Sequence, residues 1–311
     1  SKMETLLGRK LLKPVKKHEF LFEHYFQNIS QSNNFKFKHQ NWGIPVRPHD
    51  VMFFLEEISA PVYEFHISYK DLTRELPDGY WELLSDRKVL VHAPELFADS
   101  RLLDLCSESD IQLQIDNLNM VCSYARKLQK KINYGGDIQI ITNIGGFSTH
   151  NFVQESEKPN LYNSVRMNLE KVDTQGCEIL IQNMAPFPWH FGGQRFQNIF
   201  ADVHEIYQFC SQNSMRITLD TAHLSMHCNY RGENFHDALL KLSSVVAHWH
   251  ISDASGTNGE GVQMGAGDVD FNQVLSFVNS EQSFIVETWQ GHKNAGEGFR
   301  RDLEYLNRLV Q

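Results

Sequence analysis

Histidine, carboxylate and amide side chains recur where short apolar runs of this sequence end. One run ends in His250 and Asp253, and the next along the chain ends in Glu287. The other run ends carry Glu64, His66, Lys70, His92, Glu95, Asn143, Gln182, Asn183, His190, Asp220 and His223. Imidazole with carboxylate suits zinc, manganese or cobalt, and oxygen-rich sets favour manganese or magnesium. If these ends meet at one place, we expect a divalent metal ion (Mn, Zn, Co or Mg) there.

Two carboxylates are candidates for proton transfer. Glu287 follows the apolar run Phe284–Val286, and a charge at the end of a buried strand has no simple structural reason. Glu260 lies between Gly259 and Gly261 in a glycine-rich loop, which can approach a ligand closely. Taken alone, Glu260 is a solvated loop residue. Together with a metal ion, such carboxylates could move a proton next to a carbonyl through an enediolate.

The elements that would position these residues alternate along the chain from about Asn41. Eight β-rich runs occur, namely NWGIPVR from Asn41, PVYEFHISY from Pro61, KVLVHAPE from Lys88, DIQIITNIGG from Asp137, CEILIQNMAP from Cys177, RITLDTAH from Arg216, VVAHWHISDA from Val245 and SFIVETWQ from Ser283. Such runs are typical of parallel strands buried on both faces. Helical spacing follows them, most clearly over 111–132, and Asp202 and Asp270 are predicted helix caps.

Eight strand–helix units predict an α/β fold, a (β/α)8 TIM barrel, in which all strand ends surround one pocket. A doubly wound open sheet is the alternative, but no GxGxxG follows an early strand. We predict that residues 41–311 form the barrel. Residues 1–40 are predicted to form a short N-terminal extension, because residues 1–17 hold six Lys or Arg against one acid and residues 27–41 are rich in Asn, Gln and Ser.

Composition narrows the class of protein. The 311 residues are 41% hydrophobic with 21 Phe, which is enough for one large core. A formal charge of −9 and a pI near 5.9 argue against a nucleic-acid partner. The five cysteines show no CxxC spacing and are interpreted as reduced core residues. No signal peptide and no long apolar run occur, so we expect a cytoplasmic protein without a membrane partner.

Several motifs resemble the xylose-isomerase-like barrel superfamily, which includes sugar isomerases, sugar epimerases and endonuclease IV. They are LDTAH (Leu219–His223), HISDA (His250–Ala254), GAGDVDF (Gly265–Phe271) and IVET (Ile285–Thr288). Further stretches resemble a sugar-phosphate isomerase/epimerase module often joined to sialic-acid-type (nonulosonate) synthases: EFHISYKDL (Glu64–Leu72), VHAPELF (Val91–Phe97), PFPWHFGGQ (Pro186–Gln194), NGEG (Asn258–Gly261) and WQGHKNAGEGF (Trp289–Phe299). The stretch 8–26 resembles part of the SAF domain that follows such synthases.

The resemblance implies a metal site with one departure. In the epimerase branch, a Glu, an Asp, a His and a Glu on the fifth to eighth strands bind the metal. The last three match Asp220, His250 and Glu287, whereas the first falls on Gln182. An amide can bind a metal through its oxygen but cannot serve as the second catalytic base. The two-glutamate mechanism is therefore in doubt here, and Glu260 could take over the acid/base role.

Endonuclease IV has further histidine ligands. His92 and His223 match two of them, but its fourth-strand histidine falls near Asn143. A three-zinc cluster is therefore not expected.

The first hypothesis is a metal-dependent sugar or sugar-phosphate isomerase or epimerase, with Glu287 or Glu260 moving the proton. The residues expected to hold the substrate are His66, His92, His190, His223 and Lys293. A metal-dependent hydrolase or lyase of the endonuclease IV type is the second hypothesis. A non-catalytic carbohydrate-binding module is the third. A nonulosonate synthase domain is the expected protein partner, and a homo-oligomer stays open.

Overall fold

The computed structural model describes residues 40–76, 81–190 and 193–310. The predicted N-terminal extension and the SAF-like stretch lie outside the described residues, so both stay predictions.

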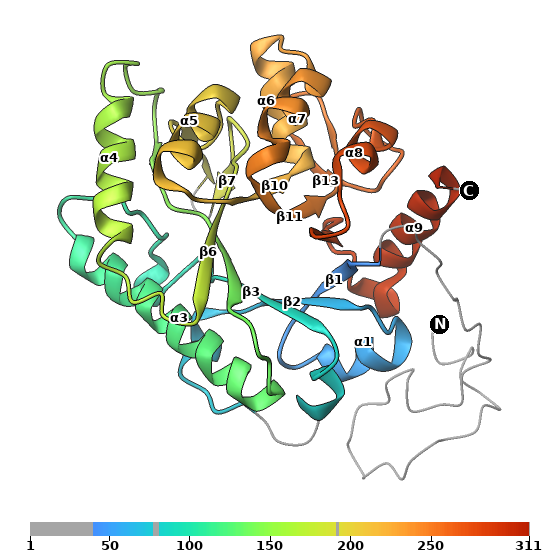
Figure 1. The fold of residues 1–311 in the computed structure, drawn as a ribbon. Coiled ribbons are helices and arrows are strands. Elements are labelled where there is room, and N and C mark those ends of the chain that lie inside the picture. Colours follow the sequence, from blue (N-terminus) through green and yellow to red (C-terminus); the bar gives the residue numbers. More distant parts are fainter. Residues whose placement is uncertain (1–39, 77–80, 191–192, 311) are drawn as a thin grey trace.

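Eight parallel strands close into a barrel, in the order β1-β14-β11-β10-β6-β4-β3-β2 (Figure 1). The strands are β1 (Trp42–Val46), β2 (Val62–His66), β3 (Lys88–His92), β4 (Ile138–Thr142), β6 (Cys177–Gln182), β10 (Ile217–Asp220), β11 (Val246–Ile251) and β14 (Ser283–Val286). Each of the eight predicted runs contains one of these strands. The (β/α)8 barrel is therefore confirmed, and the open-sheet alternative is wrong because the first and last strands pair.

Helices surround the barrel and connect its strands (Figure 1). They are α1 (Val51–Glu57), α2 (Tyr69–Leu72), α3 (Ile111–Ile132), α4 (Lys158–Leu169), α5 (Val203–Asn213), α6 (Thr221–Arg231), α7 (Phe235–Leu242), α8 (Phe271–Phe277) and α9 (Lys293–Leu309). The predicted caps are confirmed, since Asp202 accepts hydrogen bonds from the first turn of α5 and Asp270 from that of α8. Among the described residues, no helix combines the length and apolar character required to cross a membrane.

In the part of the chain that the structure describes, three short pairs of antiparallel strands lie in the loops that follow the carboxyl ends of the barrel strands. They are β5 (Phe147–Ser148) with β9 (Phe196–Gln197), β7 (Trp189–His190) with β8 (Gly193–Gln194), and β12 (Asp253–Ser255) with β13 (Gly259–Val262). The last pair lies in the glycine-rich loop, so that loop is an ordered hairpin rather than an irregular excursion.

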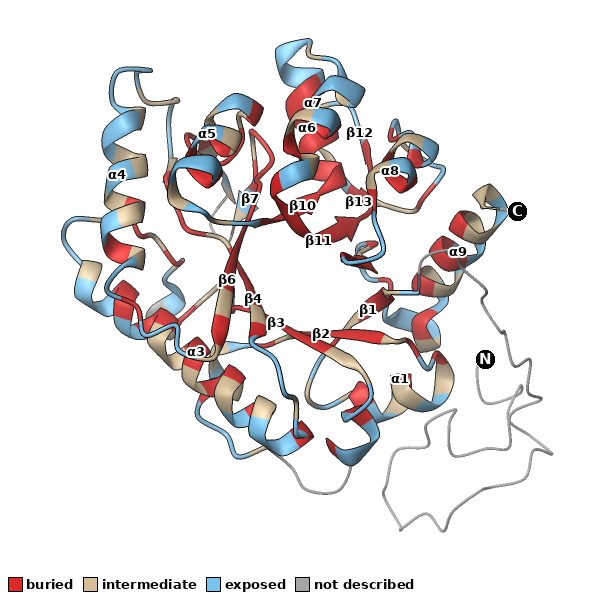
Figure 2. Ribbon diagram, viewed as in Figure 1, coloured by how far each residue is buried: buried red, intermediate tan, exposed pale blue. Residues whose placement is uncertain are grey.

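Strand β2 shows how the barrel separates its apolar and polar layers. Tyr63 and Phe65 join the main core, where Phe65 stacks on Trp81. Glu64 alternates with them and is fully buried on the opposite face, within the barrel. Figure 2 shows the barrel strands as predominantly buried. The cysteines lie in or beside the core, and all five are free thiols.

Asp253 organises the loop between β11 and α8. Its buried carboxylate accepts four backbone hydrogen bonds of 2.9–3.0 Å, from the amides of Ala254, Gly265, Gly267 and Val269. A Cβ at Gly267 would lie 2.2 Å from the Ala254 carbonyl, so this close approach requires glycine. Asp253, which the sequence places among the polar strand ends, therefore holds the loop together.

We expect Asp253→Ala to lower the free energy of unfolding by roughly 3–5 kcal/mol, because it leaves buried amides without an acceptor. Urea unfolding measures the change. Asp268→Ala is the matched control, since that exposed carboxylate accepts a single loop hydrogen bond, from Gly256 N. Its expected cost is below about 1 kcal/mol. Equal losses in the two variants would contradict the role of Asp253.

Asp302 joins α9 to the same region. Its buried carboxyl group accepts hydrogen bonds from Met264 N, Gln263 Nε2 and Thr288 Oγ1. Burial raises the pKa of Asp302 from 3.8 to about 6, against the opposing effect of these donors. The folded state therefore favours the protonated carboxyl group. Its contribution to the free energy of unfolding is therefore fully present below pH 3.8, the ordinary pKa, and is lost as the pH rises through about 6.

Asp302→Asn should remove this pH dependence. Relative to the variant, the wild type should lose on the order of 3 kcal/mol at most between pH 4 and pH 7, because each pKa unit corresponds to about 1.4 kcal/mol. Chemical unfolding of both proteins at half-unit pH intervals measures this difference. A constant difference across the range would show that Asp302 does not titrate in this way.

Candidate functional site

A cavity of about 700 Å³ opens at the carboxyl ends of the barrel strands. Its lining includes His66, His92, Gln182, His190, Asp220, His223, Glu260 and Glu287. The predicted residue His250 is fully buried and does not line the cavity, but it contacts Glu287, which does. Lys293 does not belong to the lining, and its Nζ donates to Gln290 Oε1 at 2.8 Å.

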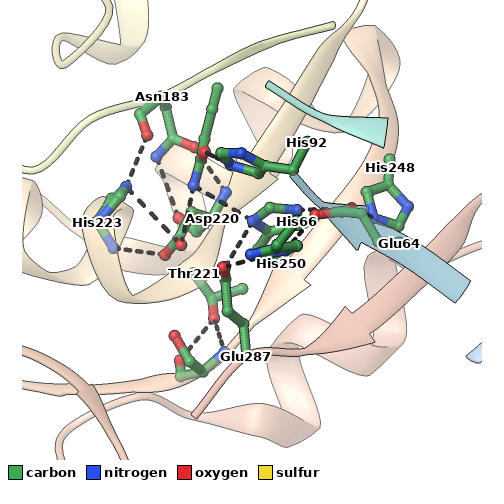
Figure 3. A network of polar contacts seen from close by, with 12 residues as sticks. Glu64, His66, His92, Asn183, Asp220, Thr221, His223, His248, His250 and Glu287 are labelled. Atoms are coloured by element: carbon green, nitrogen blue, oxygen red, sulfur yellow. Dashed lines mark hydrogen bonds and ion pairs between the residues drawn. The ribbon is translucent and has the colours of Figure 1, made fainter. Parts of the chain in front are cut away.

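Four predicted ligands come from adjacent strands. Figure 3 shows Asp220, His250 and Glu287 facing one another. The nearest side-chain oxygens or nitrogens of Asp220, His250 and Glu287 all lie within 4.8 Å of one another. Gln182 Nε2 lies 3.3 Å from both Asp220 Oδ2 and His250 Nδ1. The expected convergence of these side chains is therefore present, while metal binding itself stays a prediction.

Glu64 fixes the orientation of His250 from within the barrel. Its Oε2 lies 3.0 Å from His250 Nε2 and 2.9 Å from His248 Nε2, and its Oε1 lies 2.7 Å from His66 Nε2. Burial alone would raise the pKa of Glu64, but the three imidazoles lower it well below its usual value. An ionised Glu64 accepts from Nε2 of His250, so Nδ1 is the nitrogen that faces Asp220 and Glu287. Metal-binding histidines are commonly oriented by such a carboxylate.

The role of Glu64 was not predicted from the sequence, although a signal was present. In the run VYEFH, Glu64 lies two residues before His66, and residues two apart in a strand share one face. A carboxylate on the same inward face as a candidate site histidine is a candidate partner for it.

His92 bears on which end of the Gln182 amide faces the cluster. His92 Nδ1 lies 2.9 Å from the Ala93 carbonyl oxygen, which only accepts, so Nδ1 carries the proton. Burial, helped by the charge of His66, lowers the pKa of His92, so the ring is neutral and Nε2 accepts. That Nε2 lies 3.3 Å from the atom placed as Gln182 Oε1. In this orientation Nε2 donates to Asp220 Oδ2, whereas the reversed amide would donate to His92 and turn its oxygen toward Asp220 and His250, as a cation shared by these groups would require.

Glu260 is held over the cavity by His223. The Glu260 Oε1 atom lies 2.9 Å from His223 Nε2, and His223 Nδ1 lies 2.8 Å from the Asn183 carbonyl oxygen. Burial opposes a charge on the ring, but Asp220 and Glu260 raise the pKa of His223 to about 10. His223 is therefore an imidazolium paired with Glu260. The Glu260 side chain is 47% exposed, so it is a partly solvated loop residue that is also paired with His223.

The mouth of the cavity contains residues that the sequence did not single out. Trp189 and Trp289 are 65% and 76% exposed and belong to the lining, as do Arg47 and His292. Trp189 Nε1 donates to Asn258 Oδ1 at 3.2 Å, which connects two loops of the lining. The predicted substrate residue His190 lies nearby, with its ring 5.2 Å from that of Phe147. These side chains offer aromatic faces and polar groups to a ligand.

Solved structures with the same fold cover most of this chain. A D-allulose 3-epimerase from Methylomonas sp. in complex with D-allulose has a TM-score of 0.62 and 12% identity, covering 87% of this chain and 97% of its own. A 3-keto-D-glucoside 4-epimerase from E. coli has a TM-score of 0.59 and 14% identity, covering 87% and 100%. A probable 3-DHS dehydratase from Bacillus anthracis has a TM-score of 0.60 and 14% identity, covering 86% and 98%.

No curated protein matches the chain in sequence. The profile of one family does match, over residues 57–309, from the end of α1 to the end of α9, which includes every barrel strand except β1. The chain belongs to the xylose isomerase-like TIM barrel family.

Proposed function

We propose that this protein is a metal-dependent sugar isomerase or epimerase that moves a proton through an enediolate. The observation that carries the proposal is the convergence of Asp220, His250 and Glu287 at the base of the cavity. Membership of the xylose isomerase-like family supports this class of reaction. The epimerases of the same fold support it as well, at the level of fold.

The side chains of this chain fit a divalent cation. With the Gln182 amide reversed and His250 Nδ1 deprotonated, one amide oxygen, one imidazole nitrogen and two carboxylates would present lone pairs to a common cation. This set is compatible with Mn²⁺, Co²⁺, Zn²⁺ or Mg²⁺. A bound cation would polarise the sugar oxygens and stabilise the enediolate charge. Because the neighbouring Glu287 and Glu64 raise the pKa of His250 well above its usual value despite burial, the ring must release a proton to bind the cation.

The chain offers an unequal pair of proton carriers. Burial would raise the pKa of Glu287, but His250 and the other imidazoles around it lower that pKa to about 2, so Glu287 is ionised and can accept a proton. His223 is an imidazolium whose Nε2 lies 2.9 Å from Glu260 Oε1, so its proton can reach a substrate through the Glu260 carboxyl group. In our proposal, Glu287 is the base and the His223–Glu260 pair is the acid. This division replaces a second metal-bound glutamate, which Gln182 cannot provide.

A hydrolase or lyase on the same scaffold is the second candidate. Gln182 favours it, because such chemistry needs no second carboxylate base at that position. The endonuclease IV version is less well supported, since His92 Nδ1 and both nitrogens of His223 already have protein partners. Cleavage of abasic DNA that is abolished by a chelator would favour this class over isomerisation. The carbohydrate-binding module and the nonulosonate synthase partner stay predictions from the sequence.

The exchange of substrate hydrogen with solvent tests the proposed reaction. With Mn²⁺ in D₂O, the protein should incorporate deuterium next to the carbonyl of an aldose, ketose or sugar phosphate, as measured by NMR. Glu287→Gln should slow exchange by at least about 100-fold, and Glu260→Gln by about 10- to 100-fold. The exposed Glu281→Gln is the control and should retain exchange. A protein that binds Mn²⁺ but exchanges no hydrogen with any of these sugars would contradict the proposal.

A double-mutant cycle tests the orientation of the Gln182 amide. His92→Phe should weaken Mn²⁺ binding about tenfold, because the amide loses the acceptor that orients it. In the Gln182→Glu background, the same change should have little effect, because a carboxylate presents an oxygen either way. Isothermal titration with Mn²⁺ measures the four affinities. Equal effects of His92→Phe in both backgrounds would show that His92 does not act through the amide.

A further inference from the structure

A second group of potential metal ligands lies away from the cavity. It consists of Asp202 at the start of α5, His227 within α6 and Glu233 just after α6. One ligand atom from each lies within 4.8 Å of the other two. None of the three lines the cavity described above. We call this group the α5–α6 cluster.

His227 is the unusual member of the α5–α6 cluster. The residue is 4% exposed, and neither ring nitrogen has a hydrogen-bond partner within the described ranges. Its Nε2 lies 3.8 Å from Glu233 Oε2, which is too long for a hydrogen bond. Buried polar atoms almost always have a partner, so an ion or an ordered water is expected at this ring.

Both carboxylates have an oxygen available for such an ion. Asp202 uses Oδ1 to cap α5, accepting from His204 N at 2.9 Å and Glu205 N at 3.1 Å. For Glu233, Oε1 faces Arg231 Nε at 3.8 Å, which leaves Oε2 toward the ring. The Asp202 cap thus uses Oδ1 and not Oδ2, and Glu233 has Oε2 on the side of the ring.

The backbone around the α5–α6 cluster is fixed before any ion binds. Asp202 is held by its helix cap, and His227 lies in the interior of α6. Glu233 N donates to the Cys228 carbonyl at 2.9 Å, which closes the end of α6. Gly232 makes this closure possible with a φ of 69°. A preformed set of ligands loses little conformational entropy when it binds a metal.

We propose that Asp202, His227 and Glu233 bind a divalent transition-metal ion, with zinc as the best chemical match and solvent as the remaining ligand. Ligand atoms around a tetrahedral zinc lie about 3.3 Å apart, given bonds of about 2.0–2.1 Å. The observed 3.8 Å between His227 and Glu233 needs to close by only a few tenths of an ångström. A divalent cation would use the ring nitrogen and both carboxylates together, whereas a water molecule needs only the ring and one acceptor.

The ion would connect α5 to α6. Asp220 caps α6 and His223 lies within it, so α6 links the α5–α6 cluster to the candidate active site. Zinc at the cluster would hold the amino end of α5 against α6. The expected role is to stabilise this wall of the barrel, and this inference does not depend on the proposed reaction.

Zinc binding to the full chain tests the proposal in a background where the candidate active site is disabled. The His250→Ala variant should still bind one Zn²⁺, measured by competition with a chromophoric chelator. Adding His227→Ala should weaken this binding at least 100-fold, and adding Glu233→Gln should weaken it at least tenfold. Zn²⁺ should raise the midpoint of thermal unfolding of His250→Ala but not that of the two double variants.

Two controls match the changes in side chain and charge. His150→Ala removes an exposed imidazole and Asp237→Asn neutralises an exposed carboxylate, and neither should change the Zn²⁺ affinity of the His250→Ala variant. If His227→Ala does not fold, Glu233→Gln tests the proposal in its place, because it changes only a partly exposed side chain. The proposal is overturned if His250→Ala binds no Zn²⁺, or if the affinity survives both His227→Ala and Glu233→Gln.

Discussion

The burial of Glu64 inside the barrel is the constraint on which the candidate site depends. A carboxylate without solvent is costly unless charged or polar partners surround it, and here His66, His248 and His250 do so. The pairing determines which nitrogen of His250 faces Asp220 and Glu287. Side chains within TIM barrels are usually branched and apolar. A carboxylate and imidazoles in the barrel interior pack less efficiently than such side chains, but they orient His250.

The same logic of orientation extends to Gln182. An amide has one end that can bind a cation and one that cannot, so a glutamine ligand needs a partner that a glutamate would not need. His92 supplies this partner because the Ala93 carbonyl fixes its tautomer. Where the resemblance implies a glutamate, this chain has Gln182, and the neighbouring His92 offers an acceptor that can hold the amide nitrogen away from a cation. In the proposed metal site, this arrangement would let the cluster keep four ligands while it loses one of two potential bases.

The opposite wall of the cavity depends on the loop that Asp253 holds. Four backbone hydrogen bonds to one buried carboxylate fix the segment that follows the β12–β13 hairpin, and that hairpin places Glu260 beside His223. The resulting ion pair belongs to the cavity although Glu260 lies on a glycine-rich loop. The position of Glu260 in the site therefore depends on the ordering of this loop.

The sequence alone determined the eight strands, the helix caps and the ring of polar strand ends, because these follow from periodicity and from contacts between near neighbours in the chain. Only the tertiary structure decided the partners. Glu64 and His250 are 186 residues apart, and no local pattern specifies that they touch. Likewise, Lys293 lies close to the cavity in sequence but bonds to Gln290, because the direction of a side chain depends on the packing around it. Strand ends converge by topology, whereas hydrogen-bond partners, and therefore tautomers and charges, are set by three-dimensional contact.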